Sequence, residues 1–423
     1  MPKDQSDFFK KLQPWSRIKN DLLAVYLVPY FAKISATRKK TFYVDCFAGK
    51  GKFEDGNDGS PFLAIKKRTE ALSARKGNPA EIELAFIEKV HASELRKNLA
   101  DAFPSVEGYS VISGSFESDL AELLRGRTNQ NLFLYVDPFG IKSLQFHVFK
   151  TLRECGHFRS FEILMNFNSF GFIRAAQSIL AKNGTIQDKW DKEAHTRIPT
   201  SDAELEPFDS SLKSVEDLNS VANGDYWIDI VRRYANTPLG FKDAEKELAE
   251  AYRKELSSVF KYVLKMPIGK KNGSIPEYCM FFMTNHPDGC LIMVDNMMKR
   301  ADSLRVDVQQ GGQLQLFDQD VNNDFVDLER VRSDFRSFVK DELFKDGVVR
   351  VFPIDDLKAR FFAKYGVVCK PVALNHIFAE MENSGILQVS RSPKQSRAQS
   401  GAKRVKSQSF NTKEQSIFVS WKT

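Results

Sequence analysis

With 423 residues, the chain is too long for one average domain, and we expect two or three units of ordinary size. Hydrophobic residues at 42% and aromatic residues at 12% suffice for packed cores, while no apolar stretch is long enough to cross a bilayer. The net charge of +7 permits an anionic partner such as nucleic acid. Because the N-terminus lacks the apolar stretch of a secretory signal, we expect a soluble, cytoplasmic protein.

The 5 cysteines are scattered singly, with no Cys-x-x-Cys pair and no nearby histidine at a metal-ligand spacing. The sequence therefore predicts neither a disulfide framework nor a metal site.

The first part of the chain alternates predicted helices and strands. Residues 8–34 carry apolar side chains at helical spacing, which predicts an N-terminal helix that covers a sheet. Predicted strands follow at 41–45, 82–87, 109–112, 132–136 and 161–167, with helices between them. This alternation predicts an α/β fold with a doubly wound, Rossmann-like parallel sheet.

The pattern changes later in the chain. Residues 180–245 are polar and show no clear assignment, whereas the apolar runs 261–266 and 278–284 predict antiparallel strands. An antiparallel pair of this kind belongs at one edge of the sheet. We predict that this α/β domain occupies residues 1–300.

The C-terminal part has a different organisation. Residues 301–327 are rich in Gln, Asp, Asn and Gly and predict a linker. Helices are predicted at 331–344, 354–364 and 371–384, and strands at 386–389 and 416–421. Helices followed by a two-stranded wing indicate a winged-helix-like domain at 328–423.

A glycine turn follows the first predicted strand. From Asp45 to Gly51 the chain reads Asp-x-Phe-x-Gly-x-Gly, in which Gly49 and Gly51 let the backbone turn sharply and approach a ligand. This segment, with Phe47 at its centre, resembles the first motif of S-adenosylmethionine-dependent methyltransferases, nucleic-acid amino-methyltransferases above all. The alternative is a glycine turn in some other α/β protein.

Polar residues at the carboxyl ends of the strands are the candidate cofactor ligands, because ligands collect at that edge of a parallel sheet. The resemblance implies that Asp45 and the Gly49 and Gly51 amides hold the aminocarboxypropyl end of S-adenosylmethionine. Glu88 is placed to accept hydrogen bonds from ribose hydroxyls, and Ser115 to border the adenine. The alternatives are that Glu88 only opens a helix and that Ser115 lies in an ordinary turn.

The strand at 132–136 ends in Asp137-Pro138-Phe139-Gly140, which resembles the fourth motif of amino-methyltransferases. Methylation of an exocyclic amine needs a hydrogen-bond acceptor, a rigid turn that aims it and an aromatic face for a flipped base. Asp137, Pro138 and Phe139 supply these three parts. Phe139 stands where the family has a second proline, and Gly140 stands where it has an aromatic residue.

Several segments together resemble one family. The glycine loop, Gly59 to Pro61, Phe86 to Glu88, Asp137 to Gly140 and Thr284 to Pro287 look like the three-Cys-motif partner family, TcmP, over roughly residues 10–300. The resemblance implies a methyltransferase-like fold and a partner, a three-Cys-motif protein of radical S-adenosylmethionine character encoded nearby. It leaves the substrate open.

Other polar and aromatic residues are weaker candidates. Asn166, Asn168 and His286 could reach a substrate, but capping or turn roles are the favoured interpretation. Trp190 and Trp227, in the unassigned stretch, could close on a substrate base.

The C-terminus is basic. Between residues 391 and 406 six basic residues and no acidic residue occur, which predicts either a phosphate-binding wing loop or a solvated, disordered loop. These candidate nucleic-acid contacts are Arg391, Lys394, Arg397, Lys403, Arg404 and Lys406. The helix at 371–384, with Lys370 and Asn375 near its start, is the candidate recognition helix.

Gln313 to Phe317 has the Gln-Leu-x-Leu-Phe form of peptides that bind the bacterial sliding clamp. The favoured alternative is that Leu314, Leu316 and Phe317 fold back onto the sheet.

Two functions are therefore open. The first is S-adenosylmethionine-dependent methyl transfer to nucleic acid, and the second is a catalytically silent scaffold that presents nucleic acid to the partner enzyme. A nucleotide hydrolase is disfavoured, because the chain has no Gly-x-x-x-x-Gly-Lys-Ser/Thr loop.

Overall fold

The computed structural model describes residues 14–37, 39–74, 80–154, 158–186, 212–268, 278–309, 327–393, 409–412 and 415–422. The chain forms two compact units. Unit 1 comprises Met1–Asn285 with Ser303–Asp318, and unit 2 comprises His286–Asp302 with Gln319–Thr423. No helix within the described residues is long and apolar enough to span a membrane.

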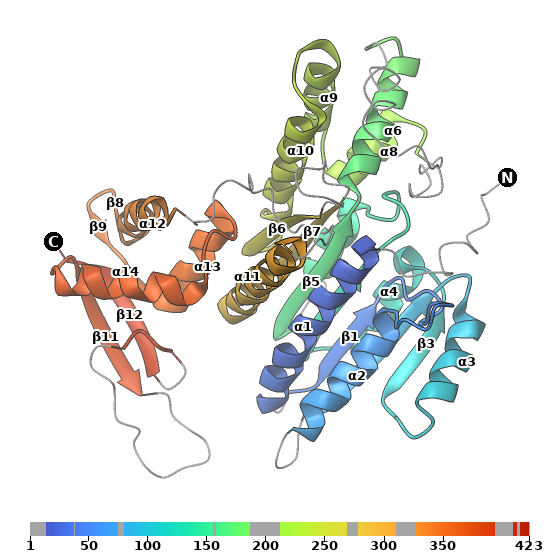
Figure 1. Ribbon diagram of the computed structural model, residues 1–423, viewed down its shortest axis with the longest axis horizontal. Helices are drawn as coiled ribbons and strands as arrows, with labels where there is room; N and C mark the ends of the chain where they lie inside the picture. Colours follow the sequence, from blue (N-terminus) through green and yellow to red (C-terminus); the bar gives the residue numbers. More distant parts are fainter. Residues whose placement is uncertain are drawn as a thin grey trace. The chain divides into compact units, whose positions relative to one another are not determined.

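Unit 1 is built on a 7-stranded sheet with the strand order β3-β2-β1-β4-β5-β7-β6 (Figure 1). Its strands are β1 (Thr41–Asp45), β2 (Ile82–Glu88), β3 (Tyr109–Ser113), β4 (Asn131–Val136), β5 (Ser160–Phe167), β6 (Tyr262–Ile268) and β7 (Tyr278–Thr284). Neighbouring strands from β1 to β5 are parallel, whereas β7 is antiparallel to both β5 and β6. The predicted parallel sheet and its antiparallel edge pair are confirmed.

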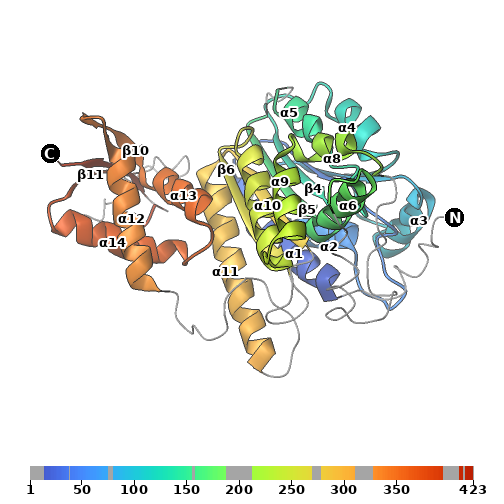
Figure 2. The ribbon, with the colours of Figure 1, turned by 90° about the horizontal axis from the view of Figure 1, so that it is seen from above.

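Helices cover both faces of this sheet (Figures 1 and 2). One face carries α1 (Pro14–Ala36) and α2 (Ser60–Ser73), with α3 (Ala92–Ala102) following β2. The other carries α4 (Phe116–Leu124), α5 (Phe146–Glu154), α6 (Ser169–Lys182), α8 (Val215–Ala222), α9 (Tyr226–Asn236) and α10 (Phe241–Leu256). Phe42 and Val44 of β1 join the core on that second face, while Tyr43 between them stacks on Phe133 towards α1.

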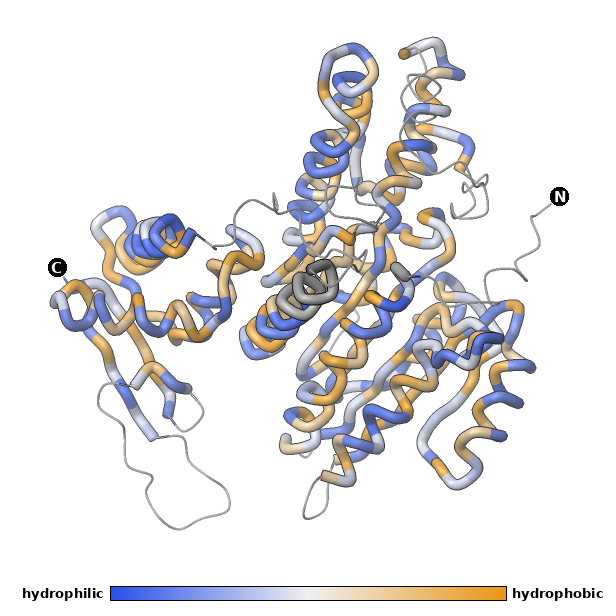
Figure 3. Tube along the Cα trace, in the orientation of Figure 1, coloured by the Kyte–Doolittle hydropathy of each residue, from blue (hydrophilic) through white to orange (hydrophobic). Residues whose placement is uncertain are grey.

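Helix α1 lies against the sheet because its apolar residues recur at helical spacing. Ile18, Leu22, Tyr26 and Tyr30 are buried, and Figure 3 shows that the helix is largely hydrophobic along its length. Tyr26 packs on Phe133 of β4 with ring centroids 5.7 Å apart. Nearer the start of α1, Lys19 reaches Asp137 just after β4, so this part of the helix lies at the carboxyl ends of the strands.

Helices α8 to α10 fill much of the stretch that the sequence left unassigned. Ser214 begins α8 with a reciprocal capping box, in which its side chain accepts from the Asp217 N–H and Asp217 accepts from Ser214. Each of these helices buries one apolar face in the same core. Residues 187–211, which include Trp190, lie outside the described residues.

Unit 2 contains short helices and a small antiparallel sheet. Its helices are α11 (Pro287–Gln309), of which the first part belongs to this unit, α12 (Leu328–Leu343), α13 (Ile354–Tyr365) and α14 (Pro371–Asn383). Its strands are β8 (Phe344–Lys345), β9 (Val348–Val349), β10 (Val351–Pro353), β11 (Leu387–Pro393) and β12 (Gln415–Trp421), and the sheet has the order β10-β12-β11. Helix α11 extends into the predicted linker, and residues 310–326 lie outside the described residues.

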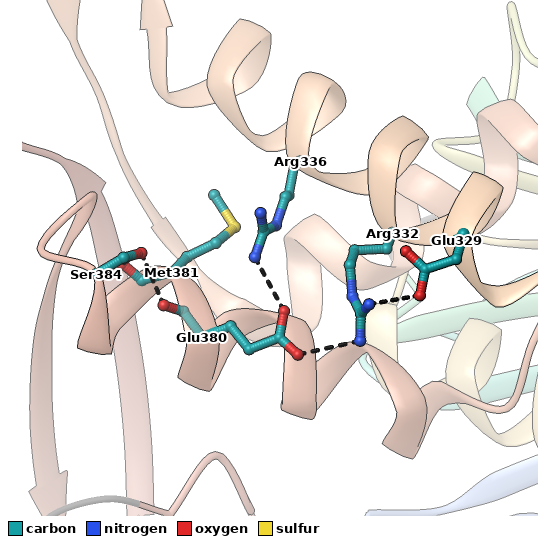
Figure 4. Close-up of polar contacts among 6 residues, drawn as sticks. All are labelled: Glu329, Arg332, Arg336, Glu380, Met381 and Ser384. Atoms are coloured by element: carbon teal, nitrogen blue, oxygen red, sulfur yellow. Dashed lines mark hydrogen bonds and ion pairs between the residues drawn. The ribbon is translucent and has the colours of Figure 1, made fainter.

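An aromatic core and a polar link join α12 to α14. Phe335 of α12 meets Phe378 of α14 edge to face, with ring centroids 5.0 Å apart. On the surface, Arg332 and Arg336 both bind the Glu380 carboxylate, at 3.2 and 2.9 Å (Figure 4). These contacts hold α14, the predicted recognition helix, in a fixed register against α12.

Candidate functional site

The end of β1 places a carboxyl group in the interior. The Asp45 side chain is fully buried, and its Oδ1 accepts the Phe47 N–H at 3.2 Å. Burial raises the pKa of Asp45 to about 7, and the neighbouring carboxylates of Asp137 and Glu88 act in the same direction. Asp45 therefore changes charge near neutral pH.

The glycine loop after β1 is held by Glu88 from the end of β2. Glu88 Oε2 accepts the Gly49 N–H at 2.8 Å, while Oε1 accepts the Val90 and His91 N–H groups at 2.8 and 2.9 Å. The Gly49 amide is thus already engaged inside the protein, which differs from the expectation that it is presented to a cofactor. Glu88 performs the helix-opening role and also anchors the loop.

Gly51 is required for packing. Its φ is +77°, and an added Cβ would lie 2.6 Å from Leu95 Cδ1 and 3.1 Å from the Phe62 ring. The Gly51 carbonyl accepts the Gly59 N–H at 2.8 Å, which closes the loop just before α2 begins at Ser60. The absence of a side chain at Gly51 therefore lets α2 and α3 approach the loop.

Asp137 at the end of β4 receives three donors. The Lys19 Nζ and the Asn166 Nδ2 each lie 2.8 Å from Oδ1, and the Tyr135 hydroxyl lies 3.2 Å from Oδ2. Lys19 belongs to α1 and its side chain is only 4% exposed, whereas that of Asp137 is 20% exposed. The Asp137 carboxylate is consequently held in one orientation, and it is partly exposed while its partner Lys19 is buried.

A pocket joins the glycine loop to the turn after β4. It contains Phe47, Gly49, Gly51, Asp137, Pro138 and Phe139, which the sequence singled out. It also contains Gly59 and Ser60, which belong to the segment Gly59 to Pro61, and residues that the sequence did not single out: Ser16, Lys19, Asn20, Ala48, Lys50, Lys52 and Phe53. The pocket therefore combines aromatic side chains and lysines with an acidic group.

The sequence contains a signal that Lys19 is buried, which could have made it a candidate site residue. It stands four residues before Leu23 and seven before Tyr26, both of which are buried core positions of α1. A lysine at a core position of an apolar helix needs a buried partner. Its partner could not be named without the fold.

Ser115 does not line this pocket. Its side chain caps α4 by accepting the Ser118 N–H at 3.3 Å, and its own N–H donates to Asp119 Oδ2 at 2.8 Å. This geometry matches the alternative expectation for Ser115, which was an ordinary turn.

The weaker candidates take structural positions. Asn168 caps α6 by accepting the Gly171 N–H, and His286 accepts the Asp288 N–H before α11. Trp227 is fully buried, and its indole N–H donates to Asn219, so this side chain does not close over the pocket. Asn166 is the exception, because it binds Asp137 directly.

In unit 2, Arg391 is committed to an internal ion pair. Its side chain is 7% exposed, binds the Glu382 carboxylate through both terminal nitrogens and lies over the Phe410 ring. Arg391 therefore braces β11 against α14, which corrects the expectation that it contacts phosphates. The other basic candidates, Lys394, Arg397, Lys403, Arg404 and Lys406, lie outside the described residues.

No cluster of His, Cys, Asp or Glu within the described residues has the arrangement of a metal site. The cysteines that the structure describes, Cys46, Cys279, Cys290 and Cys369, are buried and form no disulfide with one another. The described lining of the pocket supplies hydrogen-bonding groups, charged side chains and aromatic rings.

Comparisons with known proteins define the level of similarity. No protein-family model matches the chain, and no curated protein matches it. Among solved structures, loganic acid methyltransferase with SAH is 11% identical and covers 67% of this chain and 97% of its own, with a TM-score of 0.28. A candidate O-methyltransferase from Nostoc punctiforme is 13% identical and covers 66% of this chain and 71% of its own, with a TM-score of 0.22.

These scores are too low to carry an argument about the site. The strand order stands independently of them, because the mixed sheet β3-β2-β1-β4-β5-β7-β6 is typical of methyltransferases. The chain therefore has a methyltransferase-like α/β fold.

Proposed function

We propose that this protein is an S-adenosylmethionine-dependent methyltransferase that acts on an exocyclic amine of a nucleic-acid base. The observation that carries the proposal is the pocket that places Phe47 and the glycine loop beside Asp137, Pro138 and Phe139. A cofactor motif and an acceptor motif, separated in the sequence, thus line one space.

The residues present fit the cofactor. S-adenosylmethionine would supply an electrophilic methyl group on a cationic sulfonium, and the carboxylate of Asp137 is the acidic group that lines the pocket. Phe47, Gly49 and Gly51 would border the cofactor, and Glu88 would act by holding the Gly49 N–H and thereby the glycine loop. Because the Gly49 N–H already donates to Glu88, we expect the charge and shape of the pocket to contribute more to cofactor binding than this amide does.

The acceptor side favours an amine. Asp137 would accept a hydrogen bond from the amine, Pro138 would fix the turn and Phe139 would stack on the base. In the proposed reaction, the amine nitrogen would form a bond to the methyl carbon as the sulfonium–methyl bond breaks, and S-adenosylhomocysteine would leave. The methylated nitrogen would lose one proton, which Asp137 would pass to water. Lys50 and Lys52 at the pocket suit flanking phosphates.

Calorimetric titration with S-adenosylmethionine tests the cofactor site. Gly51→Val, a variant that would block a glycine approach, would also clash with Leu95 and is therefore a poor test. Phe47→Ala is the better variant, and we expect weaker S-adenosylmethionine binding. Because Phe47 also packs on Phe116 of the core, a melting curve must accompany the titration and establish that the variant is folded. Asp137→Ala should keep cofactor binding and abolish methyl transfer to DNA or RNA, and undiminished transfer in that variant would contradict the acceptor role.

Unit 2 supports nucleic-acid binding as part of the same proposal. Three helices and a sheet in the order β10-β12-β11 suit a winged helix, with the basic residues 394–406 between two wing strands. Changing Lys403, Arg404 and Lys406 to serine should weaken binding to all sequences. The slope of log K against log salt should fall by about 0.7 to 0.9 for each phosphate that the variant no longer neutralises.

A second function is a silent scaffold that binds nucleic acid and presents it to the three-Cys-motif partner. The specific observation that favours it is the mutual engagement of Gly49 and Glu88, two predicted cofactor ligands. Salt-sensitive nucleic-acid binding without any heat of S-adenosylmethionine binding would select this function. Copurification with the neighbouring three-Cys-motif protein is expected under both proposals.

The peptide Gln313 to Phe317 lies outside the described residues. We propose it as a sliding-clamp ligand, and loss of clamp binding on Leu316→Ala and Phe317→Ala is the expected result. Absence of binding by the intact chain would end the idea.

A further inference from the structure

Lys19 is a buried cation in a helix that precedes every recognised motif. The residue is 3% exposed, and it lies on the face of α1 that carries Leu22, Leu23 and Tyr26 against the sheet. Burying an ammonium group is costly unless it is paired and hydrogen-bonded. A packing role alone would be served better by an apolar side chain.

The contacts of Lys19 converge on the acceptor motif. Its Nζ lies 2.8 Å from Asp137 Oδ1 and 5.2 Å from the centroid of the Tyr278 ring on β7. The lysine therefore connects α1 to the end of β4 and to the antiparallel strand β7. These two contacts restrict the ammonium group from two directions.

Asn166 completes the arrangement. Its Nδ2 donates to the same Asp137 oxygen at 2.8 Å, so two donors, one charged and one neutral, hold Oδ1. Oδ2 has the longer Tyr135 contact at 3.2 Å as its hydrogen bond within the described residues. Because Oδ1 already has two donors, Oδ2 keeps more of its hydrogen-bonding capacity for a ligand in the pocket that Asp137 lines.

We propose that Lys19 is a positioning residue, which holds the Asp137 carboxylate so that Oδ2 accepts a hydrogen bond from the substrate amine. This inference rests on the proposed methyl transfer. It assigns Asp137 the role of an oriented acceptor, with Lys19 acting through it and Asn166 assisting. Lys19 thereby contributes to the turnover of the bound substrate rather than to cofactor affinity.

A positioning role predicts that loss of Lys19 lowers kcat but leaves the Kd for S-adenosylmethionine almost unchanged. Loss of the positioning charge leaves the pocket in place but lets Asp137 rotate, and misplacement of a reacting group by about 1 Å costs roughly a hundredfold in rate. We therefore expect Lys19→Met to lower kcat by tenfold or more, with a change in the S-adenosylmethionine Kd of less than twofold. Lys19→Arg keeps the charge and should recover part of kcat.

The experiment uses the full chain, S-adenosylmethionine labelled in its methyl group, and unmethylated DNA and RNA as acceptors. Lys33→Met, which replaces an exposed lysine of the same helix, is the matched control and should leave kcat and Kd unchanged. Thermal melting establishes that each variant is folded. Lys19→Gln, which keeps a neutral donor, replaces Lys19→Met in the series if that variant does not fold.

The outcomes separate this inference from the proposed function. Cofactor binding and methyl transfer by the native chain, with unchanged kcat in Lys19→Met or Lys19→Gln, would overturn the positioning role alone. Equal losses in Lys19→Met and Lys19→Arg together with weaker cofactor binding would also overturn it, because they indicate a structural role. A native chain that neither binds the cofactor nor transfers methyl groups would overturn both the inference and the proposed function.

Discussion

Glu88 accepts the Gly49 N–H at 2.8 Å, so the carboxylate that ends β2 fixes the glycine loop that follows β1. The other oxygen of Glu88 accepts the Val90 and His91 N–H groups and organises the start of α3. One side chain therefore stabilises two loops at the carboxyl edge of the sheet. The loop is held in its bent form before any ligand arrives.

The first prediction concerns this anchor. Glu88→Ala removes three hydrogen bonds to a charged acceptor, and we expect the free energy of unfolding to fall by roughly 2 to 4 kcal/mol. Glu88→Gln retains one acceptor oxygen and should lose less. Urea unfolding of the three proteins measures the difference, and equal stability of the alanine variant and the native chain would contradict the anchoring role.

The second prediction separates two reasons for a glycine: a left-handed backbone conformation and a lack of space for a Cβ atom. Gly51→Ala places a Cβ 2.6 Å from Leu95 Cδ1 at a φ of +77°, whereas Gly56→Ala has a φ of +87° and nothing within 4 Å. Gly56→Ala should cost about 1 to 2 kcal/mol from the left-handed backbone alone. Gly51→Ala should cost roughly 1 to 3 kcal/mol more because of the clash. Chemical denaturation of the pair would refute the packing argument if the two costs were equal.

The third prediction concerns pH. Because burial raises the pKa of Asp45 from 3.8 to about 7, the folded protein binds this proton more tightly than the unfolded chain. The contribution to stability is therefore present at low pH and is lost as pH rises from about 4 to about 7, at up to about 1.4 kcal/mol per pH unit. Asp45→Asn removes this loss, so the stability of the variant relative to the native chain should rise between pH 4 and pH 7. Melting curves of both proteins at pH 4 and pH 7 measure this difference in stability. A difference that is the same at both pH values would argue against a buried, titrating Asp45.

The fourth prediction compares two ion pairs in unit 2. Arg391 is 7% exposed where it binds Glu382, whereas Arg332, Arg336 and Glu380 are each about 40% exposed. Solvent screens the second group, so Glu380→Gln should cost less than about 1 kcal/mol. Glu382→Gln leaves a buried guanidinium without its charge partner and should cost about 3 kcal/mol. Denaturant unfolding of both variants measures the two losses of stability. A larger loss for Glu380→Gln than for Glu382→Gln would contradict the prediction.

Much of the fold could be predicted from the sequence because the relevant signals are local. Apolar runs predicted β1, β4 and β7, and both Asp45 and Asp137 were placed at strand ends because polar residues follow these runs directly. Parallel strand ends meet at one edge, so the approach of the glycine loop to Asp137 followed from the strand alternation. Helices α8, α9 and α10 were missed, although each has an apolar face at helical spacing and α8 begins with the Ser214 capping box, so local signals for them were present in the sequence.

The sequence by itself determined the strands, the glycine turn and the acidic residues at the site, because each depends on a few neighbouring residues. Only the tertiary structure decided that Lys19 pairs with Asp137 across 118 residues, that Glu88 serves the loop and that Arg391 turns inward to Glu382. The physical reason is that an ion pair or hydrogen bond between distant residues depends on strand order and helix packing. Residue type shows that a buried charge needs a partner, and the fold selects which partner it has.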